Sequence, residues 1–197
     1  MTAGEMVMAA PLRLEAVLIA SAGRGASVRK TGMGPARAKA SAGELEREAG
    51  QALLVVGFCG GLDGESVPGE VIIPTEVYTA ADEGHPEERV SCDLAGDLVT
   101  RLAGRGLKLR SGSIVCVSHI VTGERRAELH AGGAIAVDME SVWLAAGAGG
   151  RPFGVVRVVL DSPSHELMRP QAAIGALRAA RALRRVAGAL HEWTPAL

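Results

Sequence analysis

Two carboxylates stand out because each follows a short apolar run of the sequence. Glu140 comes shortly after the run Ala134–Val137, and Asp161 directly follows the run Phe153–Leu160. Carboxyl groups held at one site can transfer protons and can accept strong hydrogen bonds from a ligand. These two acids are therefore the first candidates for the chemistry of this protein.

Both acids are expected at the carboxyl ends of buried strands. The two apolar runs are rich in Val and Ile and are bounded by Gly or Pro, which is typical of buried strands. Between them, Ser141–Ala146 has helical character, so the unit is strand, helix, strand. Such a unit implies a right-handed crossover and parallel neighbours, and open α/β sheets bind ligands at the carboxyl ends of parallel strands. Glu140 and Asp161 are thus expected on one rim of the sheet.

The N-terminal half is expected to add two strands and a loop near the ligand. Leu14–Ala20 is predicted as the first strand, and it leads into the small-residue loop Ser21–Ser27. Leu53–Phe58 is predicted as a second buried strand that ends in the glycine turn Gly57–Leu62. Glycines directly after a strand allow a sharp turn and a close approach of substrate.

A helix is expected to begin at Pro35, because proline suits the first helical position. Gly32 and Gly34 precede it and let the backbone approach an anion at the helix N-terminus. The stretch lacks the third glycine of a dinucleotide-binding motif. A plain glycine turn that caps the helix remains an alternative interpretation.

Length and composition favour one globular domain, residues 1–197, with residues 1–10 as a loose tail. The hydrophobic content of 48% and the net charge of −1 indicate a folded protein and give no reason to expect a nucleic-acid partner. No apolar run approaches the length of a membrane span. Three scattered cysteines without metal-ligand spacing favour reduced thiols, a cytoplasmic location and no metal site. A C-terminal helix is predicted at Pro170–Leu190, and its arginines are interpreted as a helix face exposed to solvent.

Two motifs resemble a known family. The segment AVDMES, residues 136–141, is followed by PFGVVRVVLD, residues 152–161. In order and spacing they resemble the nucleoside phosphorylases and the methylthioadenosine/adenosylhomocysteine nucleosidases, and most of all the bacterial nucleoside phosphorylases associated with hopanoid biosynthesis. The glycines before Pro35 and after Phe58 are similar to motifs of the same family. The resemblance implies an α/β fold, a three-layer α/β/α sandwich with a mixed central sheet.

The resemblance also implies an enzyme that cleaves the N-glycosidic bond of a purine nucleoside. Asp161 matches the family's catalytic aspartate, which acts as an acid near the purine N7. Glu140 matches the glutamate that binds the ribose hydroxyls, and Met139 would pack against the sugar. The residues expected around the base are Phe58, Ile120 and Val121. From the residues alone, a turn cap for Asp161, a helix-end acid for Glu140 and core packing for Met139 remain open.

The acceptor of the sugar is inferred from the loop after the predicted first strand. That loop, Ser21–Ser27, contains no acid to activate water, whereas the nucleosidases carry one just after their first strand. Inorganic phosphate is therefore the expected co-substrate, and no cofactor is expected. The candidate phosphate ligands are Gly32, Gly34, Arg24 and Arg29.

Phosphorolysis of an adenine nucleoside is the main interpretation, and adenosylhopane is the substrate that the nearest relatives suggest. Two alternatives stay open. One is a hydrolytic nucleosidase of the 5′-methylthioadenosine/S-adenosylhomocysteine type, and the other is a shortened family member that binds a nucleoside without turnover. The resemblance further implies a homodimer or a larger homo-oligomer.

Overall fold

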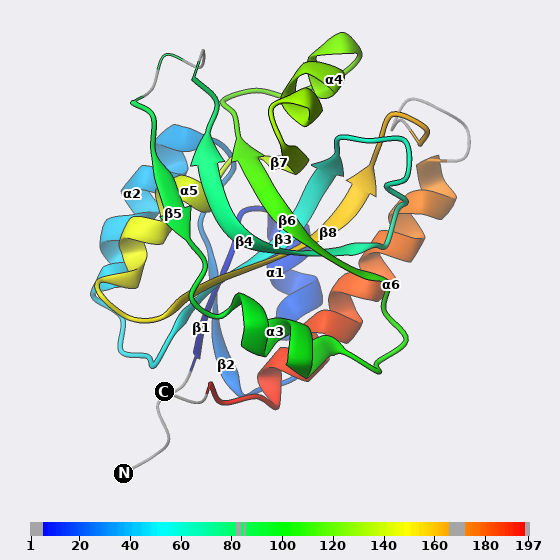
Figure 1. Cartoon of the computed structure of the whole chain (residues 1–197). Helices are drawn as coiled ribbons and strands as arrows, with labels where there is room; N and C mark the ends of the chain where they lie inside the picture. The colour runs from blue at the N-terminus through cyan, green and yellow to red at the C-terminus, as the bar shows by residue number, and fades with distance from the viewer. Residues whose placement is uncertain (1–5, 82–83, 85, 166–171, 196–197) are drawn as a thin grey trace.

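A mixed β-sheet forms the centre of the protein, and helices cover it from outside (Figure 1). The computed structural model describes residues 6–81, 84, 86–165 and 172–195. The expected α/β class with a mixed central sheet is confirmed. The strands are β1 (Met6–Ala10), β2 (Ala26–Lys30), β3 (Leu53–Gly61), β4 (Val71–Thr79), β5 (Arg89–Ser91), β6 (Leu109–Cys116), β7 (Ala134–Asp138) and β8 (Phe153–Asp161). The helices are α1 (Arg13–Ala20), α2 (Pro35–Glu46), α3 (Ala95–Leu102), α4 (Glu124–Ala131), α5 (Ser141–Leu144), the 3-10 helix η1 (Ala145–Ala148) and α6 (Ala172–His191).

Part of the sheet closes on itself. The order β2-β1-β3-β7-β6-β4-β5 is joined by β8, which pairs with both β3 and β4. The strands β3, β7, β6, β4 and β8 therefore form a ring, which β1, β2 and β5 extend at its sides. β8, the strand that closes the ring, is buried from Phe153 to Val159.

The carboxyl ends of three strands meet at one corner of this ring. β3 runs parallel to β8, and Gly60 is in register with Asp161. β7 is antiparallel to β3, and its Val137 also faces Gly60. The sequence predicts that β7 and β8 are parallel neighbours, which is wrong, since β7 pairs with β3 and β6 while β8 pairs with β3 and β4. The strand ends nevertheless converge because the sheet is closed.

The sequence places the first strand wrongly. It predicts a loose tail for residues 1–10, but Met6–Ala10 is the inner strand β1, buried along its whole length and paired with β2 and β3. The predicted strand Leu14–Ala20 is instead part of helix α1. Glu15 and Ile19 are its buried residues, and this i, i+4 spacing is that of one helix face. The apolar run thus belongs to a surface helix rich in the good helix formers Leu and Ala.

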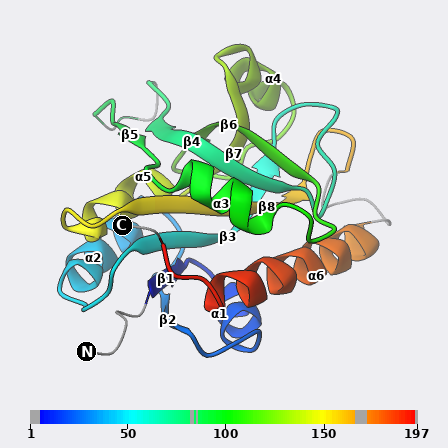
Figure 2. The same ribbon diagram turned by 60° about the horizontal axis from the view of Figure 1, so that its bottom comes forward.

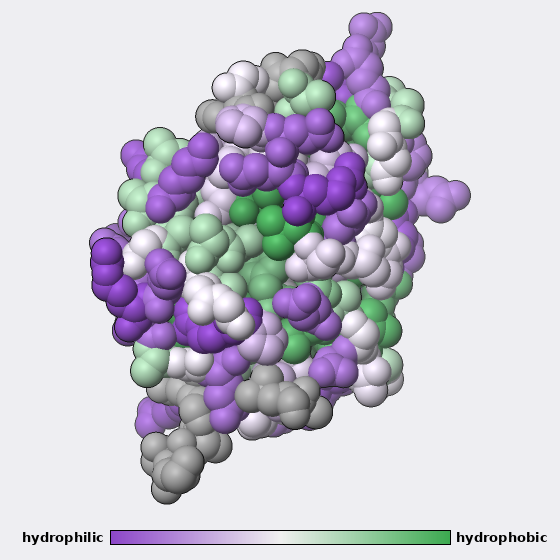
Figure 3. Space-filling model, turned by 60° about the vertical axis from the view of Figure 1, so that its left-hand side comes forward, coloured by the Kyte–Doolittle hydropathy of each residue, from purple (hydrophilic) through white to green (hydrophobic). Residues whose placement is uncertain are grey.

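Helices α1 and α6 lie side by side on one side of the sheet (Figure 2). They are linked near their C-terminal ends, where Nε2 of His191 lies 2.9 Å from the carbonyl oxygen of Ile19. On another face, around α2 and β5, hydrophilic side chains dominate the margin and hydrophobic ones gather near the middle (Figure 3). Among the described residues, no helix is both long and apolar enough to cross a membrane.

The burial of β1 makes a testable prediction. Met8 lies in the middle of this strand with no exposed surface, so Met8→Ala should lower the free energy of unfolding by about 2–5 kcal/mol through lost contacts and a cavity. Met33→Ala is the matched control, because Met33 is 44% exposed, and it should change stability by less than about 0.5 kcal/mol. Urea unfolding measures both. Equally small effects would contradict a structural role for β1.

Candidate active site

A pocket lies at the corner where the carboxyl ends of β3, β7 and β8 meet. Six of the residues that the sequence predicts for the site line it together: Phe58, Ile120, Val121, Met139, Glu140 and Asp161. Its lining also includes charged residues that the sequence analysis missed: Glu15, Arg126 and Asp138. The structure therefore brings the predicted nucleoside residues into one place, and their roles stay predictions.

A guanidinium group buried among carboxylates forms the base of the site. Arg157, on β8, has no exposed surface. Its Nη2 lies 2.5 Å from Oδ2 of Asp138 and 3.4 Å from Oε2 of Glu140. Burial opposes the charge of Arg157, but Asp138 and Glu140 outweigh this effect and raise its pKa. The cation and its anions can be buried only because they face each other.

Asp138 holds this cation from the protein side. Its carboxylate accepts a hydrogen bond from Sγ of Cys116 at 2.8 Å and another from the hydroxyl of Ser141. The backbone amide of Glu140 also donates to it, at 3.3 Å. Asp138 thereby anchors both Arg157 and the start of α5, and this fixes the backbone from which Glu140 projects.

Glu140 is held at both carboxylate oxygens. Oε1 accepts a hydrogen bond from the amide of Gly34 at 3.0 Å, and Oε2 faces Arg157. Burial raises the pKa of Glu140 to about 7, although Arg157 opposes the shift and Asp138 reinforces it. Its protonation state therefore changes in the neutral pH range.

Glu15 is the acid that the sequence analysis failed to assign. Its Oε1 accepts a hydrogen bond from the amide of Phe58 and its Oε2 from the amide of Leu12, both at 2.6 Å. Burial raises the pKa of Glu15, and this effect exceeds the opposing influence of Arg157 and of the two amides. The position of Glu15 in the sequence could have identified it, because it follows the end of the first strand, β1, by five residues. The first strand was predicted at Leu14–Ala20, a range that contains Glu15, so no acid was expected after it.

The pairing of β3 explains why Glu15 can reach the site. One edge of β3 pairs with β1 over Leu53–Val55 and with β7 at Gly60 and Gly61. Between these two ladders, the amide of Phe58 has a side-chain acceptor, Glu15, in place of a neighbouring strand. The gap between β1 and β7 thus admits a carboxylate at the edge of the ring.

Glu15 and Arg157 meet over the backbone of Gly57. A Cβ atom at this position would lie 2.5 Å from Oε1 of Glu15 and 2.7 Å from Nη1 of Arg157, so any larger residue would collide with both. Nη1 of Arg157 is buried and has no hydrogen-bond partner among the described residues. Because buried donors are normally paired, this carboxylate and this N–H are suited to hold a small polar molecule such as water.

Asp161 is held by a second buried arginine. Nη2 of Arg126, on α4, donates to Oδ2 of Asp161. The same side chain donates to the carbonyl oxygens of Val121 and Gly61, each at 3.0 Å. Arg126 therefore ties the end of β8 to the loop after β6, and it fixes the Asp161 carboxyl relative to the apolar residues of that loop.

The remaining walls of the pocket are apolar. Val121 is buried, Phe58 is half-buried, and Ile120 is 70% exposed at the mouth. Met139 lines the pocket next to Glu140. A pocket lined by apolar side chains and a few carboxylates matches the usual composition of small-molecule sites, in which a few polar groups orient a ligand between hydrophobic walls.

The four residues predicted to hold phosphate have other contacts in the structure. Arg24 is exposed in the loop beside the C-terminal end of α6, where Gly23 and Gly25 contact His191. Arg29, on β2, forms an ion pair with Glu48. The amide of Gly32 donates to the carbonyl of Pro11, and that of Gly34 donates to Glu140. Both amides therefore have partners within the protein, and a phosphate-binding role for these four residues stays a prediction.

A family model described as the phosphorylase superfamily matches residues 11–188. The chain belongs to the phosphorylase superfamily. The match begins directly after β1 and ends within α6, so it includes the whole pocket. A search of the curated proteins found no match.

Solved structures with this superfamily fold cover almost the whole chain. A 5′-methylthioadenosine/S-adenosylhomocysteine nucleosidase from Campylobacter jejuni has a TM-score of 0.79 at 16% identity, covering 96% of this chain and 100% of its own. The corresponding nucleosidase from Neisseria meningitidis, in complex with methylthio-immucillin-A, has a TM-score of 0.75 at 20% identity, with coverages of 95% and 98%. A futalosine hydrolase from Helicobacter pylori has a TM-score of 0.75 at 15% identity, with coverages of 95% and 96%.

The buried cation of this superfamily member makes a prediction about stability. Arg157→Met leaves Asp138 and Glu140 facing each other without compensation, so it should lower the free energy of unfolding by about 3–5 kcal/mol at pH 7. The loss should be smaller at pH 5. Without the cation the folded state binds protons at these carboxyls more readily than the unfolded state does, so stability falls as pH rises.

Urea unfolding at the two pH values measures this effect, with the exposed Arg47→Met as the control. A loss below about 1 kcal/mol at pH 7, or an equal loss at both pH values, would contradict the proposed charge balance.

Proposed function

We propose that the protein hydrolyses the N-glycosidic bond of a purine nucleoside. The observation that carries this proposal is the meeting of Glu15 and Arg157 over Gly57, beside the pocket that Glu140 and Asp161 also line. A buried carboxylate with a raised pKa can take a proton from water, and the unpaired N–H of Arg157 can hold that water. The similar structures named above, two nucleosidases and a hydrolase, support the same reaction class.

The sugar is assigned to the end of the pocket near Glu140. The ionised carboxylate can accept hydrogen bonds from the 2′- and 3′-hydroxyls, and Met139 offers the sugar ring a polarisable apolar surface. In this proposal, C1′ lies between the water site at Glu15 and the base slot. Negative carboxylates around the sugar also favour the positive charge that the ring develops as the bond to the base breaks.

The base is assigned to the apolar slot that ends at Asp161. In the proposed reaction, Glu15 takes a proton from water while the hydroxyl forms a bond to C1′. The bond from C1′ to the purine breaks, its electron pair leaves with the base, and Asp161 supplies a proton to N7. Arg126 acts on Asp161 by fixing the orientation of its carboxyl group. The products are a free purine and a free ribose derivative.

Phosphorolysis is the second candidate, because the matching family model is that of the phosphorylase superfamily. The contacts favour water, since an acid lies next to the proposed sugar position and the amides of Gly32 and Gly34 already have acceptors within the protein. Inorganic phosphate as co-substrate therefore stays a prediction.

An apolar 5′ substituent on the substrate fits the mouth of the pocket. Leu12, Met33 and Ile120 line it and are 37%, 44% and 70% exposed. A methylthio group or the hydrocarbon part of adenosylhopane would cover such residues, and so would a second copy of the chain in a homo-oligomer. The buried free thiols of Cys59, Cys92 and Cys116 support the expected reducing, cytoplasmic setting.

The acceptor is tested with adenosine, 5′-methylthioadenosine and longer 5′-alkyl adenosines in carefully phosphate-free buffer, followed by a phosphate titration. We expect adenine and free ribose products without phosphate. Glu15→Gln and Asp161→Asn should each lower kcat by about 10²-fold or more, while Glu44→Gln on the exposed side of α2 should not. A strict need for phosphate with formation of a ribose 1-phosphate, or full activity of Glu15→Gln, would overturn hydrolysis through Glu15.

The pKa of Glu140 predicts the pH profile. A carboxylate accepts hydrogen bonds from two hydroxyls only when ionised, and the pKa of Glu140 is raised to about 7. The ratio kcat/KM for a ribonucleoside should therefore fall as pH decreases through about 7, since this ratio reports groups of the free enzyme. Glu140→Gln should lose this dependence and raise KM, and the wild type should prefer ribosides over 2′-deoxyribosides. A flat wild-type profile between pH 5 and pH 8, with equal use of both sugars, would contradict the assignment.

A further inference from the structure

The outward face of α6 is entirely basic or apolar. Its exposed arginines are Arg178, Arg181, Arg184 and Arg185, which fall within about a third of the helix circumference at 100° per residue. Residues 172–191 contain no Asp or Glu. None of the ion pairs among the described residues involves these arginines. A protein with a net charge of −1 thus concentrates positive charge on one helix face.

Exposed apolar side chains accompany these arginines. Ile174 and Leu177, on the same face of α6, are 58% and 50% exposed. On the neighbouring α1, Leu14 and Val17 are 60% and 57% exposed, and Glu15, the acid of that helix, points inward. These four make up most of the large apolar residues that are exposed in the described part of the chain. We call the outward residues of α1 and α6 the α1–α6 surface.

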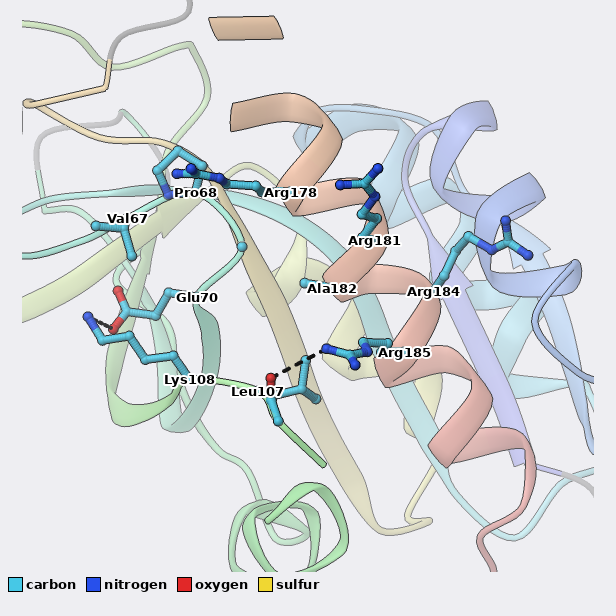
Figure 4. Close-up of a pocket in the computed structure, with 12 residues that line it drawn as sticks. Val67, Pro68, Glu70, Leu107, Lys108, Arg178, Arg181, Ala182, Arg184 and Arg185 are labelled. Carbon is cyan, nitrogen blue, oxygen red and sulfur yellow. Dashed lines mark hydrogen bonds and ion pairs between the residues drawn. The ribbon is translucent and has the colours of Figure 1, made fainter. Parts of the chain in front are cut away.

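A groove runs along one side of this surface, between α6 and the loops at residues 67–70 and 106–108 (Figure 4). Its volume is about 720 Å³, and its lining joins apolar side chains to basic ones. The apolar residues are Val67, Pro68, Leu107 and Ala182, and the basic ones are Lys108, Arg178, Arg181, Arg184 and Arg185. Glu70 is the acid in this lining, and it is paired with Lys108 at 3.1 Å. The groove therefore keeps an excess of positive charge available to a ligand.

We propose that the α1–α6 surface docks on an anionic phospholipid bilayer, with lipid phosphate groups bound along the groove. Arginines attract anionic lipid headgroups, and apolar side chains exposed beside them can enter the boundary between headgroups and acyl chains. The arginines attract the anionic headgroups, and Leu14, Val17, Ile174 and Leu177 enter the boundary of the acyl chains. The attachment is peripheral.

Charge argues against two other occupants. A second copy of the chain bound through the same surface would bring four arginines against four arginines, which is repulsive. Nucleic acid would be attracted by the charge, but the described lining of the groove has no aromatic side chain for base stacking, and the exposed aliphatic residues would gain nothing from phosphates. An anionic bilayer satisfies both the charged and the apolar parts of the surface.

The proposal is tested by sedimentation of the full chain with vesicles of phosphatidylcholine alone and with vesicles that contain 30% phosphatidylglycerol. We expect binding to the anionic vesicles that weakens with increasing salt, and at least tenfold weaker binding to the neutral ones. Arg178→Gln/Arg181→Gln/Arg185→Gln should lower the partition coefficient by up to about 10²-fold at low salt, or roughly fivefold for each arginine. Ile174→Ser/Leu177→Ser should remove the part of the binding that resists high salt.

The matched control is Lys30→Gln/Arg37→Gln/Arg47→Gln, which removes the same charge from exposed positions on β2, in α2 and at its end. It should keep most of the binding, and circular dichroism checks that every variant is folded. Equal losses in both triple variants would show attraction by overall charge alone and would overturn the proposed surface. Absence of binding to anionic vesicles at low salt, including the case in which the surface captures only an acidic protein, would overturn it as well.

Discussion

The site depends on one buried cation. Arg157 satisfies the carboxylates of Asp138 and Glu140 and lies beside that of Glu15, and each of these acids would be costly to bury alone. The same interaction sets their chemistry, because Arg157 opposes the rise in pKa that burial imposes on Glu15 and Glu140. Burial still raises both pKa values, that of Glu140 to about 7, which suits the proposed roles of Glu15 as a base and of Glu140 as a ribose ligand. The stability of the fold and the proposed catalysis therefore both depend on the interactions of Arg157 with the buried carboxylates.

The closed ring explains how residues that are distant in sequence reach this cation. β8 supplies Arg157 and Asp161, β7 leads to Asp138 and Glu140, and β3 supplies the backbone at Gly57. An open sheet of parallel strands would place the ends of β7 and β8 on one rim, as the sequence suggests, but it would leave no gap at the edge of β3. In the ring, the gap between the β1 and β7 ladders exposes the amide of Phe58, and Glu15 fills it.

The C-terminal half of the site could be predicted from the sequence, and the N-terminal half could not. The segments around Glu140 and Asp161 are apolar runs with distinctive ends, so local pattern and position agree. At the N-terminus, Met6–Ala10 is a short strand of weak β propensity that is recognisable only from its two partners, β2 and β3. The neighbouring run Leu14–Ala20 has the stronger apolar signal, yet it forms a helix. Because the first strand was assigned to Leu14–Ala20, Glu15 was not recognised as an acid that follows the first strand. Phosphate was therefore the expected acceptor.

Arg126 and Arg157 were missed for a different reason: an arginine inside an apolar or charged segment gives no sign of its buried partners.

Two surfaces of the protein carry opposite charge, although the net charge is only −1. At the pocket, carboxylates outnumber the buried arginines, which suits the proposed cleavage, in which the sugar becomes positive. On α6, arginines are exposed, no acid is present in the helix, and the described ion pairs leave them uncompensated. A solvated face explains exposed arginines, but it does not explain why Ile174 and Leu177 share that face, since exposing them to water brings no gain. The combination suits an interface that offers anions at one depth and hydrocarbon at the next, and the surface of an anionic bilayer, the proposed partner, offers both.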